Sequence, residues 1–360
     1  MTTDLIEASS PAPAAPASKI RNAVDVFSER LSLARLILIV LVVYVHFPLE
    51  VPSERSISSI NPLEPAFIAN ATFLRFSVTI LTIMSGFIMF AKHADQQGLR
   101  TVEKKVRTLL VPFLFWNLTL VAALYLAQRL GILSGQRLDL LGANAQTWAD
   151  ATLAWSTRPV NYPLYFLRDL FVISLIAVAI SRIVRANVIP VIAVCVLIAE
   201  YNLDGNLILR TPMLIAFFIG AAMAIYKVPL DALDRGLPYF AALLLVTCLV
   251  HYYYPSENSG LLISILGGLA MWTLTSLVGR SVTMQKLARL AKFAFPIYLI
   301  HGIILFGVLA LGVQISNSFV GLAMWLVLPL VIAIGSALLF RLFSLVLPRL
   351  ASFATGGRGA

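Results

Sequence analysis

Long apolar runs recur along the whole chain, and they constrain its fold more than any other feature. The first reads LARLILIVLVVYVHF over residues 33–47. About 20 mostly apolar residues cross a bilayer as a helix, because the backbone polar groups must be satisfied within the segment. The pattern predicts an all-α polytopic membrane protein of about ten transmembrane helices. They are expected at 31–47, 73–91, 109–127, 164–183, 188–201, 211–226, 238–254, 261–278, 293–313 and 319–347.

Composition agrees with a membrane protein. Charged residues make up 12% of the chain and hydrophobic residues 59%, whereas soluble domains carry about 25% charged residues. The net charge of +10 is compatible with nucleic acid, but in a membrane protein it marks cytoplasmic loops, so we expect no nucleic-acid partner. Cys195 and Cys248 lie inside apolar runs, so we expect small core residues, no disulfide framework and no metal site.

The two ends differ from the membrane segments. Residues 1–30 are rich in Ala, Pro, Ser and charge, and they lack the apolar core of a signal peptide. We expect a disordered cytoplasmic tail over 1–30, a membrane domain over 31–348 and a short cytoplasmic tail over 349–360. The last residues, TGGRGA, look disordered.

Basic residues alternate between the connections, and this predicts the orientation. The even connections hold thirteen Lys or Arg residues and the odd ones five, so the positive-inside rule places the even connections and both termini in the cytoplasm. The chain shows no convincing inverted repeat of the kind found in many transporters.

The first apolar run contains two costly residues, Arg35 and His46. They are eleven residues apart, about 16 Å along a helix, and eleven residues is close to three turns, so both side chains share one face. Ionisable residues inside the membrane indicate function by default. The alternative is that Arg35 extends to the cytoplasmic headgroups and His46 lies at the outer interface.

Depth along the helices predicts two polar groups. The external group is His46, Arg75 and Arg168. The cytoplasmic group is Arg35, Ser85, Tyr298 and His301, with Lys104, Lys105 and Arg107 in the adjoining basic loop. Each has a plainer alternative: Ser85-Gly86 allows close helix packing, the basic loop sets topology alone, and His301 makes a buried hydrogen bond.

Five short motifs occur in a fixed order. They are Arg35 with His46 eleven residues later; Arg75 with Ser85-Gly86 ten residues later; Lys104-Lys105-Val106-Arg107 before Pro112; Tyr165-Phe166-Leu167-Arg168; and Ile297-Tyr298-Leu299-Ile300-His301. Together, over most of residues 30–305, they resemble the integral-membrane acyltransferase family three. The chain departs from the family pattern at Ser32, where an acidic residue is common, at Tyr165 in place of Trp, and at Pro296. Ser32 puts in doubt any mechanism that needs a carboxylate beside Arg35.

The resemblance implies an enzyme of the bacterial inner membrane. The family transfers an acyl group, commonly acetyl, from cytoplasmic acyl-CoA to a hydroxyl of an extracytoplasmic or lipid-linked carbohydrate. Carried onto this chain, His46 is the expected general base or acyl relay, and Arg75 or Arg168 stabilises the oxyanion. The expected donor-binding residues are Arg35, Ser85, Lys104, Lys105, Arg107, Tyr298 and His301.

Two other classes of function fit the intramembrane charges. A transporter or flippase for a lipid-linked glycan would also need Arg and His inside the membrane. A non-catalytic component of a polysaccharide assembly complex is the third possibility. The sequence leaves open the acyl group, the acceptor hydroxyl and the choice between direct transfer and a relay.

Overall fold

The computed structural model describes residues 23–47, 62–132, 138–205, 207–255, 257–279, 281–310 and 318–358, and every regular element in them is helical. The α-helices are α1 (Ala23–His46), α2 (Glu64–Ala71), α3 (Phe76–Ala91), α4 (Leu99–Lys105), α5 (Val111–Arg129), α6 (Ala145–Leu153), α7 (Tyr165–Ala179), α8 (Ser181–Ala186), α9 (Val188–Glu200), α10 (Pro212–Ile225), α11 (Leu237–Tyr253), α12 (Glu257–Thr275), α13 (Val282–Leu290), α14 (Ala294–Ala310), α15 (Phe319–Val346) and α16 (Pro348–Ala354). Short 3-10 turns are η1 (Phe73–Arg75), η2 (Ala94–Gln97), η4 (Tyr162–Leu164), η5 (Leu230–Leu233), η6 (Ser276–Gly279) and η7 (Ala291–Phe293), and η3 (Val106–Leu110) is π-helical.

The protein is an all-α polytopic membrane protein, as the sequence predicts. Each of the ten predicted segments corresponds to one apolar helix in the described part of the chain: α1, α3, α5, α7, α9, α10, α11, α12, α14 and α15. Five continuous helical stretches there are long and apolar enough to cross a membrane: Glu64–Ala91, Leu99–Arg129, Tyr162–Ala179, Val282–Ala310 and Phe319–Val346. Four shorter apolar helices lie over Val188–Glu200, Pro212–Ile225, Leu237–Tyr253 and Leu262–Thr275.

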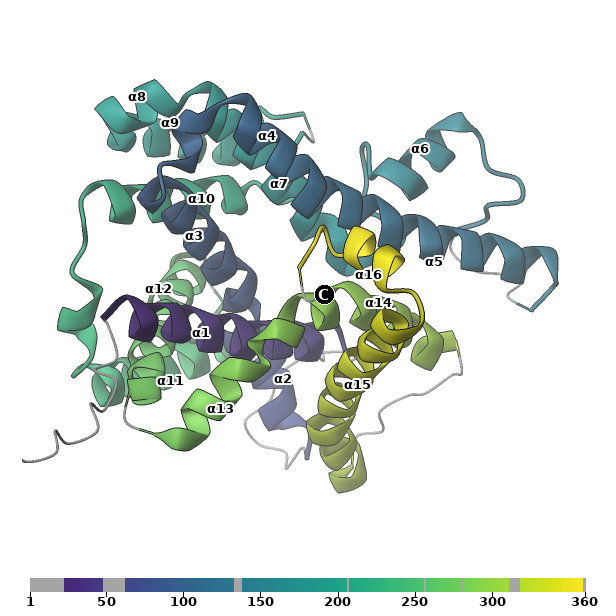
Figure 1. Ribbon diagram of the computed structural model, residues 1–360. Coiled ribbons are helices and arrows are strands. Elements are labelled where there is room, and N and C mark those ends of the chain that lie inside the picture. Colours follow the sequence, from purple (N-terminus) through teal and green to yellow (C-terminus); the bar gives the residue numbers. More distant parts are fainter. Residues whose placement is uncertain are drawn as a thin grey trace, which may run out of the picture.

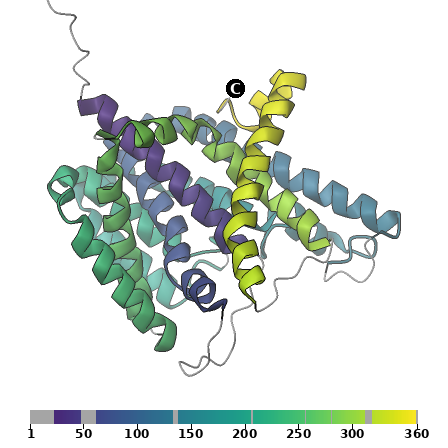
Figure 2. The ribbon, with the colours of Figure 1, turned by 90° about the horizontal axis from the view of Figure 1, so that it is seen from below.

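Helix α1 lies at the centre of the bundle (Figure 1). It packs against α3 and α12 on one side and against α13, α14 and α15 on the other. The second view shows α1 passing between the α11–α12 hairpin and α15 (Figure 2). A residue on α1 is therefore surrounded by elements from most of the sequence.

Helices α3 and α10 cross at very close range because each presents a glycine. A Cβ on Gly86 would lie 2.0 Å from the carbonyl oxygen of Phe217, and a Cβ on Gly220 would lie 2.0 Å from that of Ile83. Small residues let helix backbones approach in this way. The glycine of the Ser85-Gly86 pair thus has the packing role that we weighed as the alternative to chemistry.

Ion pairs join segments that the charge count places on one side of the membrane. Arg185 donates to Asp95 through two nitrogens at 2.7 Å, and the carboxylate of Asp95 is fully buried. Arg30 binds Asp231 at 2.8 Å and Asp234 at 2.7 Å. Both pairs agree with the predicted arrangement of cytoplasmic connections.

The expected disorder of the two ends was wrong where the structure describes them. Helix α1 begins at Ala23, so 23–30 is helical, and the side chain of Arg30 is buried against Trp272, with its guanidinium carbon 4.0 Å from the ring centroid. Residues 1–22 lie outside the described part. At the other end, α16 packs on α5 and Thr355 is fully buried. Ion pairing and packing order these segments, although their composition is typical of disorder.

Candidate functional site

Two histidines that are far apart in the sequence meet beside the last turn of α1. His46 is the final residue of α1 and His301 lies in α14, with 5.6 Å between the ring centroids. His301 is fully buried and His46 is half-buried. The ring of Tyr298 lies 5.9 Å from that of His301, and its hydroxyl donates to the carbonyl of Pro163.

Backbone carbonyls assign the same tautomer to both imidazoles. His46 Nδ1 lies 2.8 Å from the carbonyl oxygen of Val42, and His301 Nδ1 lies 2.7 Å from that of Tyr298. A carbonyl only accepts, so each Nδ1 carries the proton and each Nε2 keeps a lone pair. Neither Nε2 has a hydrogen-bond partner within the described residues, and that of His301 is buried.

The position of His301 corrects one prediction. We expected Tyr298 and His301 in the cytoplasmic group, because the apolar run starts near residue 293. In the structure the helix is one stretch over Val282–Ala310, so His301 lies nineteen residues after its start. The amphipathic first turns of α13 hid this start from the sequence pattern. His301 therefore lies beside His46, and Tyr298 lies beside His301.

A cationic residue that the sequence analysis counted only as a loop charge lies next to this pair. Arg210 Nη2 donates to the hydroxyl of Tyr162 at 3.1 Å, and the Tyr162 ring meets that of His46 edge-on, with 5.3 Å between centroids. The guanidinium carbon of Arg210 lies 5.6 Å from the ring centroid of Tyr165. Tyr162 begins the short turn η4, and Pro163 is the second residue of that turn. No sequence motif marks Arg210 as a site residue, and only its contacts with Tyr162 and Tyr165 do so.

Arg168 supports Arg210 through a carboxylate. Arg168 Nη1 lies 3.0 Å from Asp169 Oδ1 and also donates to the carbonyl of Leu207. The fully buried Asp169 accepts the backbone N–H groups of Leu209 and Arg210, at 3.1 and 2.9 Å. The hydrogen bonds of Arg168 to Asp169 and Leu207 thus hold this loop against α7, and another, to the carbonyl of Trp155 at 3.4 Å, reaches the loop before α7.

A buried amide without partners lies on the same face of α14. Asn161 is 1% exposed, and neither its Oδ1 nor its Nδ2 has a hydrogen-bond partner among the residues that the structure describes. A Cβ on Gly302 would lie 2.3 Å from Asn161 Oδ1, so only glycine beside His301 leaves room for the amide. Buried polar atoms left unmatched in this way are costly, and a ligand can satisfy them.

Two other predicted residues have local hydrogen bonds. Arg75 is exposed, and its Nε donates to the carbonyl of Asn70 at 2.9 Å. Ser85 Oγ donates to the carbonyl of Leu81 at 2.8 Å, one turn back in α3. Both hydrogen bonds are local and contact no other site residue, so the predicted roles of Arg75 in oxyanion binding and of Ser85 in donor binding stay predictions.

Unpaired cations gather around Arg35, near the middle of α1 and eleven residues before His46. Arg35, Lys104, Lys105, Arg107 and Arg358 form no ion pair with any described residue. Arg358 lies near Arg35 and near Lys105. The loss of hydration that the surrounding protein causes lowers the pKa of Arg358 to about 10, and the charge of Arg35 is a second, smaller cause. Like charges held together without a counter-ion are unfavourable, so this cluster suits an anionic ligand.

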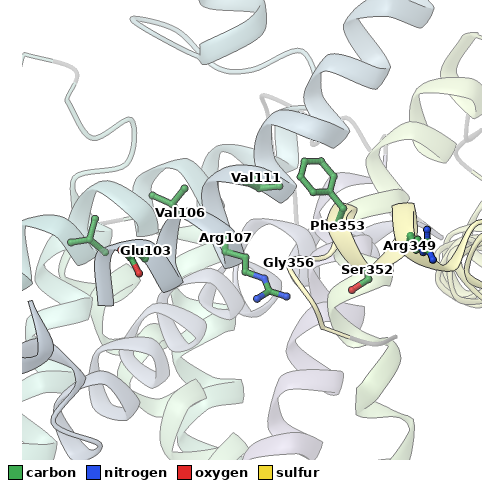
Figure 3. Close-up of a pocket in the computed structure, with 9 residues that line it drawn as sticks. Glu103, Val106, Arg107, Val111, Arg349, Ser352, Phe353 and Gly356 are labelled. Carbon is green, nitrogen blue, oxygen red and sulfur yellow. The ribbon is translucent and has the colours of Figure 1, made fainter. Parts of the chain in front are cut away.

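A cavity adjoins the cations, between α4–η3–α5 and α16 (Figure 3). Its volume is about 640 Å³, within the range of small-molecule sites. Val106, Val111 and Phe353 line it with apolar surface, and Arg107 points across it toward Gly356. Pro112 has no N–H to continue the helical ladder, and the π-helical η3 (Val106–Leu110) ends two residues before it.

A second cavity, of about 440 Å³, lies near the histidine pair. It is lined by the loop between α6 and α7, including Thr157 and Arg158, and by Phe306 of α14. The guanidinium carbon of Arg158 is 5.1 Å from the ring centroid of Tyr162. In the described ranges no group of three His, Cys, Asp or Glu residues is placed to hold a metal ion.

Comparison with known proteins identifies the family. The family model described as an acyltransferase domain matches residues 28–342. The succinoglycan biosynthesis protein ExoH of Rhizobium meliloti (strain 1021) is 30% identical over 291 residues, which cover 76% of this chain and 77% of that protein. No solved structure matches the chain. The chain therefore belongs to the integral-membrane acyltransferase family three, the family that its five motifs resemble.

Proposed function

We propose that the protein transfers an acyl group, most simply acetyl, from acyl-CoA at the cytoplasmic face to a hydroxyl of an extracytoplasmic or lipid-linked carbohydrate. The observation that carries this proposal is His46, whose Nε2 lone pair is free beside His301 at one end of α1. The family supplies the reaction type. The unpaired cations around Arg35, near the middle of α1, supply a binding site for an anionic donor.

The donor spans the distance between these two sites. Its phosphates bind the cationic cluster, which includes Arg35, Lys104, Lys105 and Arg107. From Arg35 to His46 is eleven residues, about 16 Å along α1, so the pantetheine arm brings the thioester to the imidazole. Ser85, on the neighbouring α3, remains a proposed contact for that arm.

His46 removes the proton from the acceptor hydroxyl. The hydroxyl oxygen then attacks the thioester carbonyl, the carbon–sulfur bond breaks, and His46 returns the proton to the thiolate, giving an ester and free CoA. In the relay version, Nε2 of His46 attacks the thioester, the carbon–sulfur bond breaks and CoA leaves as a thiolate. The acceptor hydroxyl then attacks the acyl-imidazole, its proton passes to Nε2 of His301 and on to the thiolate, and the carbon–nitrogen bond to His46 breaks. In direct transfer, the buried lone pair of His301 stabilises the protonated form of His46.

Cations around the pair stabilise the oxyanion. Arg210, bonded to Tyr162 against His46, is the best-placed donor, and Arg168 positions it through Asp169. Arg75 remains a predicted oxyanion contact from the start of α3. We assign Asn161 to the carbonyl or hydroxyl of a bound substrate, because its buried amide is otherwise unsatisfied.

The acceptor is a carbohydrate of a surface polysaccharide. The similarity of this chain to a protein of succinoglycan biosynthesis supports this class of acceptor. The acceptor enters through the 440 Å³ cavity, and Trp155, which is 67% exposed on the same loop, offers a stacking surface for a sugar ring. We place the protein in the inner membrane of a bacterium, where acyl-CoA is available on one side only.

The test compares the acylation of surface polysaccharide in cells that make wild type, His46→Ala or the control His93→Ala at equal membrane levels. His93 is an exposed histidine outside the site. Removing a general base lowers a rate by about 10²–10⁴-fold, so His46→Ala should lose a defined acyl mass while His93→Ala keeps it. Loss of the whole polysaccharide from the surface would favour a transporter, and an unchanged acyl pattern would favour a non-catalytic role.

A further inference from the structure

The C-terminal segment Pro348–Arg358, which we name the strap, is fixed to the cytoplasmic end of α5. Trp116 Nε1 donates to the carbonyl of Ala354 at 3.0 Å, and both atoms are buried. Ala351, Ala354 and Thr355 have no exposed surface. Figure 1 shows α16 lying between α5 and α14. The strap therefore has a defined position beside the cationic cluster.

A glycine allows the strap to touch η3. Gly356 has φ +63°, and a Cβ on it would lie 2.3 Å from the carbonyl oxygen of Arg107. Any other residue would meet that backbone oxygen and would also strain the left-handed turn. The chain then continues through Gly357, at φ +81°, to Arg358.

The turn places Arg358 where helices from three parts of the sequence converge. Its guanidinium carbon lies 4.6 Å from the ring centroid of Phe295 in α14. Arg35 of α1 and Lys105 of α4 are close enough to interact with its charge. No described acidic residue pairs with Arg358. Arg358 is thus an exposed cation that lies against Phe295, close to two other cations that repel it.

We propose that the strap completes the phosphate-binding site for the nucleotide end of the thioester donor, with Arg358 as a binding residue. This rests on the proposed function, since that assigns the cationic cluster to the donor. The 640 Å³ cavity between η3 and the strap, which Arg107 and Gly356 line, takes the nucleoside. Arg358, with the charges of Arg35 and Lys105 nearby, binds the phosphates. Guanidinium groups suit this task because they bind phosphate oxygens through two N–H groups at once.

The test is CoA binding by the full chain in lipid nanodiscs, measured by titration calorimetry. CoA carries the nucleotide end that every acyl-CoA donor shares. A lost charge-assisted contact weakens binding, so Arg358→Ala should raise the Kd about tenfold or more. Arg358→Lys should keep part of the affinity, and the matched control Arg182→Ala, an exposed arginine elsewhere, should bind as wild type does.

A second variant displaces the strap without removing a charge. Gly356→Ala should weaken CoA binding as Arg358→Ala does, because the strap must move off η3. Its control is Gly131→Ala, which carries the same backbone strain at φ +70° with no atom within 4 Å of the new methyl group. A melting curve without CoA verifies that each variant is folded.

The outcomes separate this inference from the proposed function. If wild type binds CoA and both Arg358→Ala and Gly356→Ala bind equally well, the strap is not part of the site, although the donor proposal stands. If wild type does not bind CoA, the donor proposal is wrong and this inference falls with it. Weaker binding in both variants, with both controls unchanged, supports the strap.

Discussion

The crossing of α3 and α10 gives a prediction with a magnitude that follows from the structure. In Gly220→Ala, the added methyl carbon would lie 2.0 Å from the carbonyl oxygen of Ile83. Non-bonded heavy atoms are most stable at about 3.5–4.0 Å, so the two helices must separate by about 1.5 Å. The obstructing atom belongs to the backbone, so no side-chain rotation relieves the contact.

Overpacking costs about 1–3 kcal/mol, and a backbone clash belongs at the upper end of that range. Alanine regains about 1 kcal/mol of helix propensity over glycine, so the net loss in the free energy of unfolding is about 2 kcal/mol. At about 2–4 °C per kcal/mol for a large domain, the melting temperature should fall by about 4–8 °C.

The assay is thermal unfolding of the purified protein in nanodiscs, followed by tryptophan fluorescence. The matched control is Gly335→Ala in α15, where no atom lies within 4 Å of the new methyl group. The control should melt at the wild-type temperature or slightly above it. If Gly220→Ala is as stable as the control, the close crossing of α3 and α10 is wrong.

Two further predictions concern arginines outside the motifs. Arg210→Gln should lower acyl transfer at least as much as Arg75→Gln at equal membrane levels. The reason is that Arg210 donates a hydrogen bond to Tyr162, whose ring packs on His46. Normal acyl transfer in Arg210→Gln would show that Arg210 is not part of the site. Arg185→Ala should lower the free energy of unfolding by about 3–5 kcal/mol, because it leaves the buried carboxylate of Asp95 without its cation, and an unchanged melting temperature would contradict that pairing.

The sequence predicts the helices well because their signal is local. An apolar run must be helical in a membrane, and all ten predicted runs correspond to a helix in the described chain. Two of the helical stretches begin earlier in the chain than the sequence predicts. Ala23 and Val282 begin helices in amphipathic or charged sequence, where a pattern of apolar residues gives no signal.

The site was predicted only in part, because it depends on contacts between distant segments. The motif residues His46, Tyr298 and His301 come together in space, although we had grouped the last two with the cytoplasmic residues. Arg210 and Arg358 belong to no motif, and only the fold brings them to Tyr162 and Arg35. A residue that acts through its position on a loop cannot be found from its neighbours in the sequence.

The most direct test of the central claim uses membrane vesicles of both orientations and acetyl-CoA that carries a labelled acetyl group. Acetyl-CoA does not cross the membrane, so it reaches the cytoplasmic face only in inside-out vesicles. We predict labelled carbohydrate in inside-out vesicles with wild type or His93→Ala, and none with His46→Ala. Equal labelling in right-side-out vesicles, or full labelling with His46→Ala, would contradict a cytoplasmic donor that is passed along α1 to His46.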